Sequence, residues 1–389
     1  MDTTTILNQL QHLLPLSEFS SFVRQHQADK YVKRFSCKDQ LTVLLYAQAT
    51  GKDSLREIET GLRMWDSRWY HLGLQSVSRS TLARVNEDRP WQIYESLFYA
   101  LLEKCGKLTP GTASFNFENP LYAMDSTTVD LCLSLFPWAT FHHEKGAIKL
   151  HTLFNVRSQI PAFLTVTEWR QTDVSALQAL GLDRMPKGSI LVMDKGYNDY
   201  AEFHRIHASE RFFVVRLKEK AQIFTLEQHP VNEAGVLKDE RVAFALPAAT
   251  KDYPDDLRLV TYYDAESKKT YKFLTNNDKL SAKTIADIYR QRWQIELFFK
   301  WIKQHLKIKT FLGTSKNAVM TQVWVAMIYF LLLSWIKAQT KFQGSLLDLT
   351  RMVAEMLLQN VSLIDILRLT PKSLPRALAR VAPLQMALL

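Results

Sequence analysis

Three carboxylates in the sequence have the type and setting of a metal-dependent catalytic site. Asp125 and Asp194 each stand at the polar end of an apolar run that is typical of a strand, and Glu296 lies within a long helical segment. In open α/β sheets, binding and catalytic groups gather at strand ends. Mg²⁺ prefers such hard oxygen ligands, and two bound ions can activate a nucleophile and stabilise the leaving oxygen of a phosphodiester. Asp125, Asp194 and Glu296 are therefore predicted to be metal ligands and catalytic residues.

The helical segment around Glu296 carries a second signal. At about 100° per residue, the side chains of four residues project within roughly a 60° arc: Tyr289, Arg292, Glu296 and Lys303. Lys300 lies on the same face. A separate apolar stripe is formed by Ile288, Ile295, Phe298, Ile302 and Leu306. Cations and a hydroxyl beside a metal-bound carboxylate would position a phosphate backbone, so the polar face is a candidate DNA contact. A solvated charged face is the alternative.

Other acidic and histidine residues are candidates for which a structural explanation is favoured. Asp173 and Asp199 are interpreted as turn formers or helix caps, because most isolated aspartates at strand ends have that role. The three histidines His142, His143 and His151 could be metal ligands, but their polar surroundings favour a solvated turn and a strand.

Two lysines and two tryptophans complete the candidates. Lys149 and Lys195 are plausible phosphate contacts. Trp138 and Trp169 could stack on an unpaired base, although packing in the core or in a hairpin is favoured for both.

Composition limits the classes of protein to consider. With 389 residues, two or three domains are expected. Lys and Arg exceed Asp and Glu by 49 − 39 = 10, and a pI near 9.3 favours an anionic polymer as partner; a basic protein without such a partner is the alternative. Cys37, Cys105 and Cys132 are odd in number and far apart, which argues against a disulfide framework or a cysteine zinc site and suits a reducing compartment.

The sequence also bears on location. It begins Met-Asp-Thr-Thr-Thr, without the basic start of a secretory signal. The longest apolar stretch, residues 323–336, is short for a membrane span and is interpreted as part of a buried helix at 322–336. A cytoplasmic protein with no membrane partner is expected.

The first part of the chain is predicted to be helical. Leu41, Leu44, Leu45 and Ala49 have helical spacing, and Gly51 can end that helix. Ser54 and Glu57 have the spacing of a capping box. Residues 78–84 form a further short helix that presents two basic side chains, Arg79 and Arg84. Short helices with such a member suggest a DNA reader of the helix-turn-helix type, and a plain helical bundle is the alternative.

After a predicted linker at 106–120, rich in Gly, Pro, Ser and Thr, the pattern changes to strands. Strand-like runs are predicted at 121–131, 148–156, 162–169, 189–193 and 211–217. A helix at 174–182, capped by Thr172 or Asp173, separates the third run from the fourth. This order predicts a mixed α/β sheet.

Residues 220–275 hold short strand-like runs at 241–246, 258–263 and 270–275, and are predicted to be a strand-rich insertion. A long helix with Ser281 as N-cap is expected to continue to about Leu306. The predicted domains are a helical DNA-binding domain at 1–110, a catalytic domain at 111–320 and a helical region at 321–389.

The spacing Tyr289-(two)-Arg292-(three)-Glu296-(six)-Lys303 matches the Tyr-Arg-Glu-Lys signature of DDE transposases of the insertion sequence 4 family. Asp125 in "AMDST" and Asp194 in "DKGY" resemble the first two acids of that family. Residues 311–319 resemble the stretch that follows the signature, and the opening helices resemble the domain that often precedes the catalytic one.

This resemblance implies a ribonuclease H-like catalytic fold with a strand-rich insertion before the last acid. It also implies Mg²⁺ or Mn²⁺, no nucleotide cofactor, and excision of a DNA element between terminal inverted repeats by a homodimer assembled on duplex DNA. Two alternatives stay open. An intact set of acids disfavours an inactive helix-turn-helix repressor, and the signature helix disfavours a host nuclease or resolvase of related fold.

Overall fold

The computed structural model describes residues 4–65, 69, 74, 77–106, 117–132, 134–142, 145–168, 172–306, 308 and 310–368. The chain groups into two compact units. The helical unit comprises Met1–Thr109 and Ile302–Leu389, and the sheet unit comprises Pro110–Trp301. The sheet unit thus ends before residue 320, where the sequence places the end of the catalytic domain, because the chain after Trp301 groups with the N-terminal helices. Most of the predicted linker, 107–116, falls outside the described residues.

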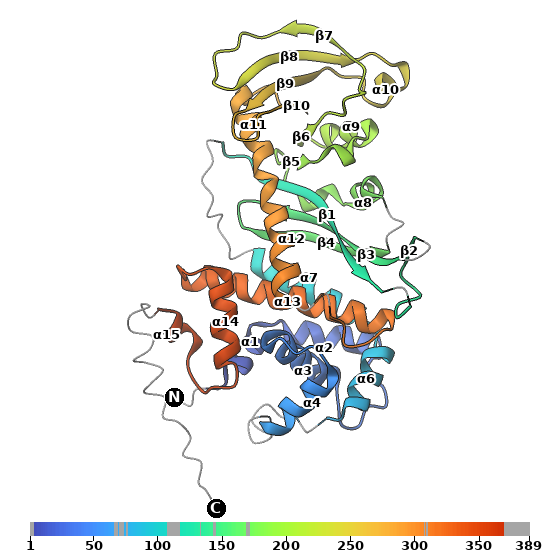
Figure 1. Ribbon diagram of the computed structural model, residues 1–389, viewed down its shortest axis with the longest axis vertical. Coiled ribbons are helices and arrows are strands. Elements are labelled where there is room, and N and C mark those ends of the chain that lie inside the picture. Colours follow the sequence, from blue (N-terminus) through green and yellow to red (C-terminus); the bar gives the residue numbers. More distant parts are fainter. Residues whose placement is uncertain are drawn as a thin grey trace, which may run out of the picture. The chain divides into compact units, whose positions relative to one another are not determined.

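The sheet unit is built on one ten-stranded sheet (Figure 1). The strand order is β2-β3-β1-β5-β6-β10-β9-β8-β7, and β4 pairs with β3. The strands are β1 Leu121–Leu131, β2 Thr140–His142, β3 Lys145–Asn155, β4 Ile160–Glu168, β5 Ile190–Met193, β6 Phe212–Arg216, β7 Ile223–Gln228, β8 Val236–Phe244, β9 Leu257–Asp264 and β10 Lys269–Thr275. The predicted mixed α/β class is confirmed.

The centre of this sheet combines both kinds of pairing. β1 is antiparallel to β3, and β3 to β4. β1 is parallel to β5, and β5 to β6. Every residue of β5 is buried, as is usual for a parallel strand covered on both faces. The run predicted at 121–131 coincides with β1, and those at 189–193 and 211–217 each contain one of the two parallel partners.

The strand-rich segment at 220–275 extends the central sheet. β10 pairs antiparallel with β6, and β9, β8 and β7 follow in order. β9 and β10 lie at the predicted runs, whereas β8 begins five residues before the predicted run at 241–246 and ends within it. β7 was not predicted, although Phe224, Thr225, Leu226 and Glu227 alternate between apolar and polar residues; it is an edge strand whose residues after Ile223 are all exposed.

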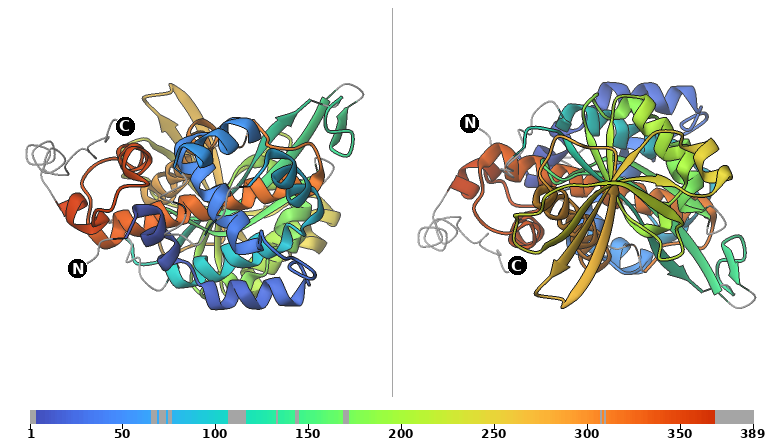
Figure 2. Two further views of the ribbon diagram at one scale, coloured as in Figure 1. Left: turned by 90° about the horizontal axis from the view of Figure 1, so that it is seen from below. Right: turned by 90° about the horizontal axis from the view of Figure 1, so that it is seen from above.

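Helices lie on both faces of the sheet (Figure 1). A core containing Met124 and Met193 packs against three helices, α8 Asp173–Ala179, α9 Tyr200–Ala208 and α10 Pro247–Asp252. α11 Ala282–Gln291 and α12 Trp293–His305 lie on the other face. Side chains alternate along a strand, so Asp125 and Asp194 point to the face of α11 and α12. The right-hand view of Figure 2 shows the twist of the sheet, because its strands fan out around one axis.

The helical unit is organised around α13, Lys316–Thr340, which contacts α3, α6, α7 and α14. Its other helices are α1 Ile6–Leu13, α2 Leu16–Gln25, α3 Cys37–Thr50, α4 Leu55–Met64, α6 Arg79–Asp88, α7 Gln92–Gly106, α14 Leu346–Met356 and α15 Leu363–Arg368. The prediction of a buried helix at 322–336 is confirmed by the burial of α13. α13 is long and apolar enough to cross a membrane, but 89% of its most apolar stretch is buried inside the protein, as in the core helix of a folded unit.

The ends of the N-terminal helices confirm part of what the sequence predicts. Gly51 ends α3 in the left-handed region at φ 67°, where a residue without Cβ is favoured. Ser54 caps α4 by accepting the backbone N–H of Glu57, but the Glu57 carboxylate accepts from Asp53 and not from Ser54, so the predicted capping box is only half formed. Ser78, expected within the helix at 78–84, is the N-cap of α6. α3 is buried on all sides from Gln40 to Ala49, so the apolar stripe expected there is part of a fully enclosed helix. Most residues between α4 and α6 lie outside the described ones, and the helix-turn-helix interpretation stays a prediction.

Candidate active site

The register of two parallel strands brings the first two acids together. Met124 of β1 is the partner of Met193 of β5, the last pair in their ladder. Asp125 and Asp194 are the next residues along the two strands, so they lie side by side on the same face. This is the edge of a sheet where parallel strands end, at which ligands commonly bind.

The helix that carries the third acid is interrupted at Arg292. Ser281 is the N-cap, as predicted, but the expected single helix is divided into α11 and α12. The Arg292 amide donates to the Tyr289 carbonyl at 3.1 Å, and the Ile295 amide donates to the Arg292 carbonyl at 3.2 Å. These i to i−3 bonds tighten the turn. Glu296 consequently lies in the first turn of α12, rather than in the middle of a helix, and a carboxylate is stabilised at that end.

The signature residues contact all three carboxylates. Arg292 Nη1 donates to Asp125 Oδ2 at 2.9 Å, and Nη2 donates to Glu296 Oε1. The Tyr289 hydroxyl donates to Asp194 Oδ1 at 3.2 Å. The side chains of Arg292, Asp125 and Glu296 are 16%, 20% and 32% exposed. The structure thus brings together the acids predicted to form one site, with Tyr289 and Arg292 directed at them; the contact of these two residues with DNA stays a prediction.

The electrostatics of the site centre on Asp125. Burial raises its pKa, and the nearby carboxylates of Glu296 and Asp194 act in the same direction. The backbone N–H of Ser126 and the guanidinium of Arg292 act against them, and the resulting pKa is about 6. Charges this close and this shielded from water disfavour full ionisation.

The donor set fits a hard divalent cation. Each acid offers carboxylate oxygens, and within the described residues the second oxygens of Asp194 and Glu296 accept no hydrogen bond. In the described part of the chain, no three acidic, histidine or cysteine side chains are already gathered as a ligand cluster. The Arg292 guanidinium lies between Asp125 and Glu296 and supplies the positive charge that a bound cation would supply.

A polar network lies on the opposite face of the sheet, below Asp125. Ser126 Oγ donates to Asp173 Oδ1 at 2.7 Å, and Lys149 Nζ lies 2.7 Å from the same oxygen. His151, fully buried, is 3.6 Å from it. Although burial acts to raise the pKa of Asp173, hydrogen bonds from Lys149 and Ser126 lower it. Ser126 also donates its backbone N–H to Asp125 Oδ1 at 2.8 Å, so the network connects directly to the acid.

This network corrects two predictions. Lys149 was expected to contact phosphate, but it is only 8% exposed and its ammonium group pairs with Asp173, so it is not available to DNA. Asp173 was expected to be a turn former or cap, but Thr172 is the N-cap of α8 and Asp173 is an ion-pair partner. No local sequence pattern indicates the Ser126–Asp173 contact, since it joins residues 47 apart. Asp199 does cap a helix, α9, as predicted.

The other candidates are placed as follows. Lys195 is exposed directly after Asp194, and Lys300 is exposed on α12. Lys303 is partly buried, and Arg79 and Arg84 are exposed on α6; these three belong to the helical unit. Their role as DNA contacts stays a prediction.

The aromatic and histidine candidates divide in the same way. Trp138 packs against Phe136 with ring centroids 6.5 Å apart, as hairpin packing predicts. His151 Nε2 is 3.1 Å from the hydroxyl of Thr167. His143, Trp169 and the side chain of His142 lie outside the described residues.

One residue near the acids was missed by the sequence interpretation. Tyr197, in the "DKGY" segment, is fully buried, and burial together with the carboxylates of Asp173 and Asp125 raises its pKa well above the ordinary value. Its position three residues after Asp194 was the available signal.

Comparisons with known proteins bear on the whole chain. A family model described as a transposase DDE domain matches residues 116–332, and a model described as a domain of unknown function matches residues 2–75. The chain is 31% identical over 276 residues to a probable transposase for insertion sequence element IS5377 of Geobacillus stearothermophilus, covering 70% of each chain. It is 30% identical over 319 residues to a putative transposase, y4zB, of Sinorhizobium fredii, covering 80% of this chain and 86% of that one.

A solved structure shares the fold. The piggyBac transposase in a synaptic complex with hairpin DNA matches with a TM-score of 0.50 and 11% identity, covering 99% of this chain and 87% of that one. At this identity the likeness concerns the fold alone. Together with the family match, it confirms the ribonuclease H-like fold that the sequence predicted.

Proposed function

Because the chain belongs to the DDE transposase family, we propose that it is the transposase of an insertion sequence and that Asp125, Asp194 and Glu296 are its catalytic residues. It would cut DNA at the ends of the element and join the freed ends to a target. The observation that carries this proposal is the convergence of the three acids, with the Arg292 guanidinium in contact with two of them.

Mg²⁺ held by these carboxylates would activate the attacking hydroxyl and stabilise the leaving oxygen of the phosphodiester; Mn²⁺ offers the same chemistry. Two residues of the signature would align the carboxylates for that reaction. Tyr289 fixes the orientation of Asp194 through its hydroxyl. Arg292 contacts both Asp125 and Glu296, and its positive charge would also attract the phosphate of a bound DNA strand.

We further propose that the partner is duplex DNA, both the terminal inverted repeats and the target, and that the chain acts on it as a homodimer in the bacterial cytoplasm. The net charge of +10 supports DNA as the partner, since phosphate neutralisation dominates DNA affinity. The relative named as a probable transposase for an insertion sequence element and the neighbour solved as a synaptic complex with hairpin DNA support it further.

The test is an excision assay on a plasmid that carries the ends of the element. With the purified chain and Mg²⁺, cleavage at the boundary between element and flanking DNA is expected. Chelation of the metal should stop it, and Mn²⁺ should restore it. A protein that binds the ends but never cleaves them with either metal would contradict the proposal and would favour a repressor.

A further inference from the structure

The segment between α2 and α3 carries positive charge with no acidic partner. Lys30, Lys33 and Arg34 are exposed, and none of them lies within ion-pair distance of an acid in the part of the chain that the structure describes. Tyr31, between them, is 88% exposed. This basic loop, defined as residues 30–34, is therefore a cationic and aromatic surface that the fold itself does not use.

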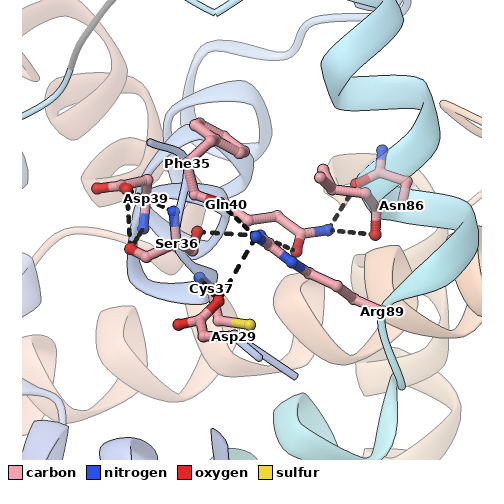
Figure 3. Close-up of polar contacts among 9 residues, drawn as sticks. Asp29, Phe35, Ser36, Cys37, Asp39, Gln40, Asn86 and Arg89 are labelled. Atoms are coloured by element: carbon pink, nitrogen blue, oxygen red, sulfur yellow. Dashed lines mark hydrogen bonds and ion pairs between the residues drawn. The ribbon is translucent and has the colours of Figure 1, made fainter. Parts of the chain in front are cut away.

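Both ends of the basic loop are fixed by one buried arginine (Figure 3). Arg89, 5% exposed, donates to the Ser36 carbonyl at 3.0 Å and to the Phe35 carbonyl. It also lies 3.5 Å from Asp29. Asp29 Oδ1 accepts the backbone N–H of Cys37 at 2.8 Å. The residues directly before and after the loop are thus joined to the same guanidinium.

The same arginine connects the loop to α3 and α6. Arg89 Nη1 donates to Gln40 Oε1 at 3.0 Å, and Gln40 Nε2 donates to Asn86 Oδ1 at 2.8 Å (Figure 3). Arg89 directly follows α6, the helix that carries the exposed Arg79 and Arg84. The loop is therefore fixed to the C-terminal end of α6, which is the other basic element of the helical unit.

The backbone of the loop is ordered as well. The Lys30 amide donates to the Gln27 carbonyl at 3.0 Å, and the Val32 amide to the Asp29 carbonyl at 3.1 Å. Tyr31 is held at φ 63°, in the left-handed region, which a bulky residue seldom adopts. Order established before binding lowers the cost of association, so this loop is prepared to contact a partner.

We propose that the basic loop, residues 30–34, is a contact for the phosphate backbone of duplex DNA. The proposal rests on the proposed function, and it gives a role to the part of the chain matched by the domain of unknown function. Three cations within five residues repel one another, and a polyanion relieves that repulsion. Backbone contacts of this kind position a protein on DNA without reading sequence. Among polyanions, duplex DNA is the one that the family must bind.

The test compares DNA binding by the full chain and by a variant in which Lys30, Lys33 and Arg34 are all changed to Gln. Binding to a short labelled duplex is followed by fluorescence anisotropy from about 50 to about 200 mM salt. The slope of log affinity against log salt should decrease by about 0.9 for each lost phosphate contact, and affinity near 0.1 M salt should fall on the order of 100-fold. All three side chains are exposed, so thermal unfolding should match that of the parent.

A matched control removes the same charge elsewhere in the helical unit. Lys337, Lys341 and Arg351, on or beside α13 and α14, are changed to Gln, and near-parental affinity is expected. Arg89→Lys tests the anchoring separately. It keeps the cations of the loop but loses the fork of hydrogen bonds, so affinity should fall about tenfold while the salt slope stays unchanged.

Parental affinity and slope in the loop variant would overturn the proposal. So would an equal loss in the control, since net charge alone would then explain the effect. Unchanged DNA binding together with altered self-association in sedimentation would assign the loop to a protein partner instead. These outcomes are separate from failure of the proposed function, which would appear as a parent protein that binds the ends of the element but does not cleave them.

Discussion

The guanidinium of Arg292 donates a 2.9 Å hydrogen bond to Asp125, a residue 167 positions earlier in the chain. The contact joins the break between α11 and α12 to the central strand β1. Because the same guanidinium also reaches Glu296, one cation balances two acids of the site. The position of the third acid relative to the first therefore depends on a side chain of the signature itself.

Replacing Arg292 by Ala should destabilise the metal-free protein and make its stability more dependent on Mg²⁺. Removal of one partner leaves largely buried carboxylates without compensation, which costs about 3 kcal/mol. A bound cation would restore part of that charge balance. Thermal unfolding with and without Mg²⁺ measures both effects. Arg290→Ala is the matched control, since Arg290 is exposed and lies 3.6 Å from Asp264; equal behaviour of the two variants would contradict the assignment.

Glu296→Gln should abolish strand cleavage while leaving binding to the ends of the element largely intact. The substitution keeps the size of the side chain and an acceptor for Arg292, but removes the anionic oxygen that a metal requires. Several kcal/mol of transition-state stabilisation correspond to a loss of about 10³-fold or more in rate. Cleavage and binding are measured on the same labelled duplex. A variant that nicks at near the parental rate would show that Glu296 holds no metal.

Tyr289→Phe should slow cleavage by about 10- to 100-fold with little effect on DNA affinity. The hydroxyl donates to Asp194 at 3.2 Å, and a hydrogen bond to a charged group contributes about 1.5–3 kcal/mol. Tyr253→Phe is a suitable comparison, because that hydroxyl lies 2.8 Å from His207 Nδ1 on the opposite face of the sheet. Single-turnover cleavage rates distinguish the two. If affinity falls and the rate does not, Tyr289 contacts DNA rather than aligning the acid.

Mg²⁺ affinity should decrease as pH falls below about 6, because the pKa of Asp125 is raised to that value and its proton must leave before a metal binds. The decrease is about tenfold per pH unit for one proton. The stability of the metal-free protein should change with pH in the opposite direction. The native carboxyl holds its proton between 3.8 and about 6, where the unfolded one has lost it, so this contribution is present at low pH and disappears as pH rises through 6.

Titration calorimetry with Mg²⁺ at a series of pH values checks the first trend, and thermal unfolding in chelator checks the second. Asp125→Asn should remove both, whereas Asp130→Asn, an exposed acid on the same strand, should leave both unchanged. A metal affinity that is flat across pH 6 would mean that Asp125 is already ionised in the native protein.

Local patterns in the sequence were sufficient for much of the fold. β1 has the predicted bounds, and the N-caps Ser54 and Ser281 lie where they were expected. Strand alternation, helical spacing and caps depend on neighbours within one turn or one strand, so a single sequence contains them. β7 was missed although its residues from Phe224 to Glu227 alternate between apolar and polar, and the structure leaves both sides of this edge strand exposed.

The acids themselves and the spacing of the signature residues were also determined by the sequence, and the family match followed from them. Only the tertiary structure decided what Arg292 and Lys149 contact. Arg292 contacts Asp125 because of the position of β1 in the sheet and the tightened turn between α11 and α12. The ammonium group of Lys149 is paired with Asp173 on α8. Such contacts join residues far apart in the chain, and they are set by strand register and by burial, where the cost of an unpaired charge selects the partner.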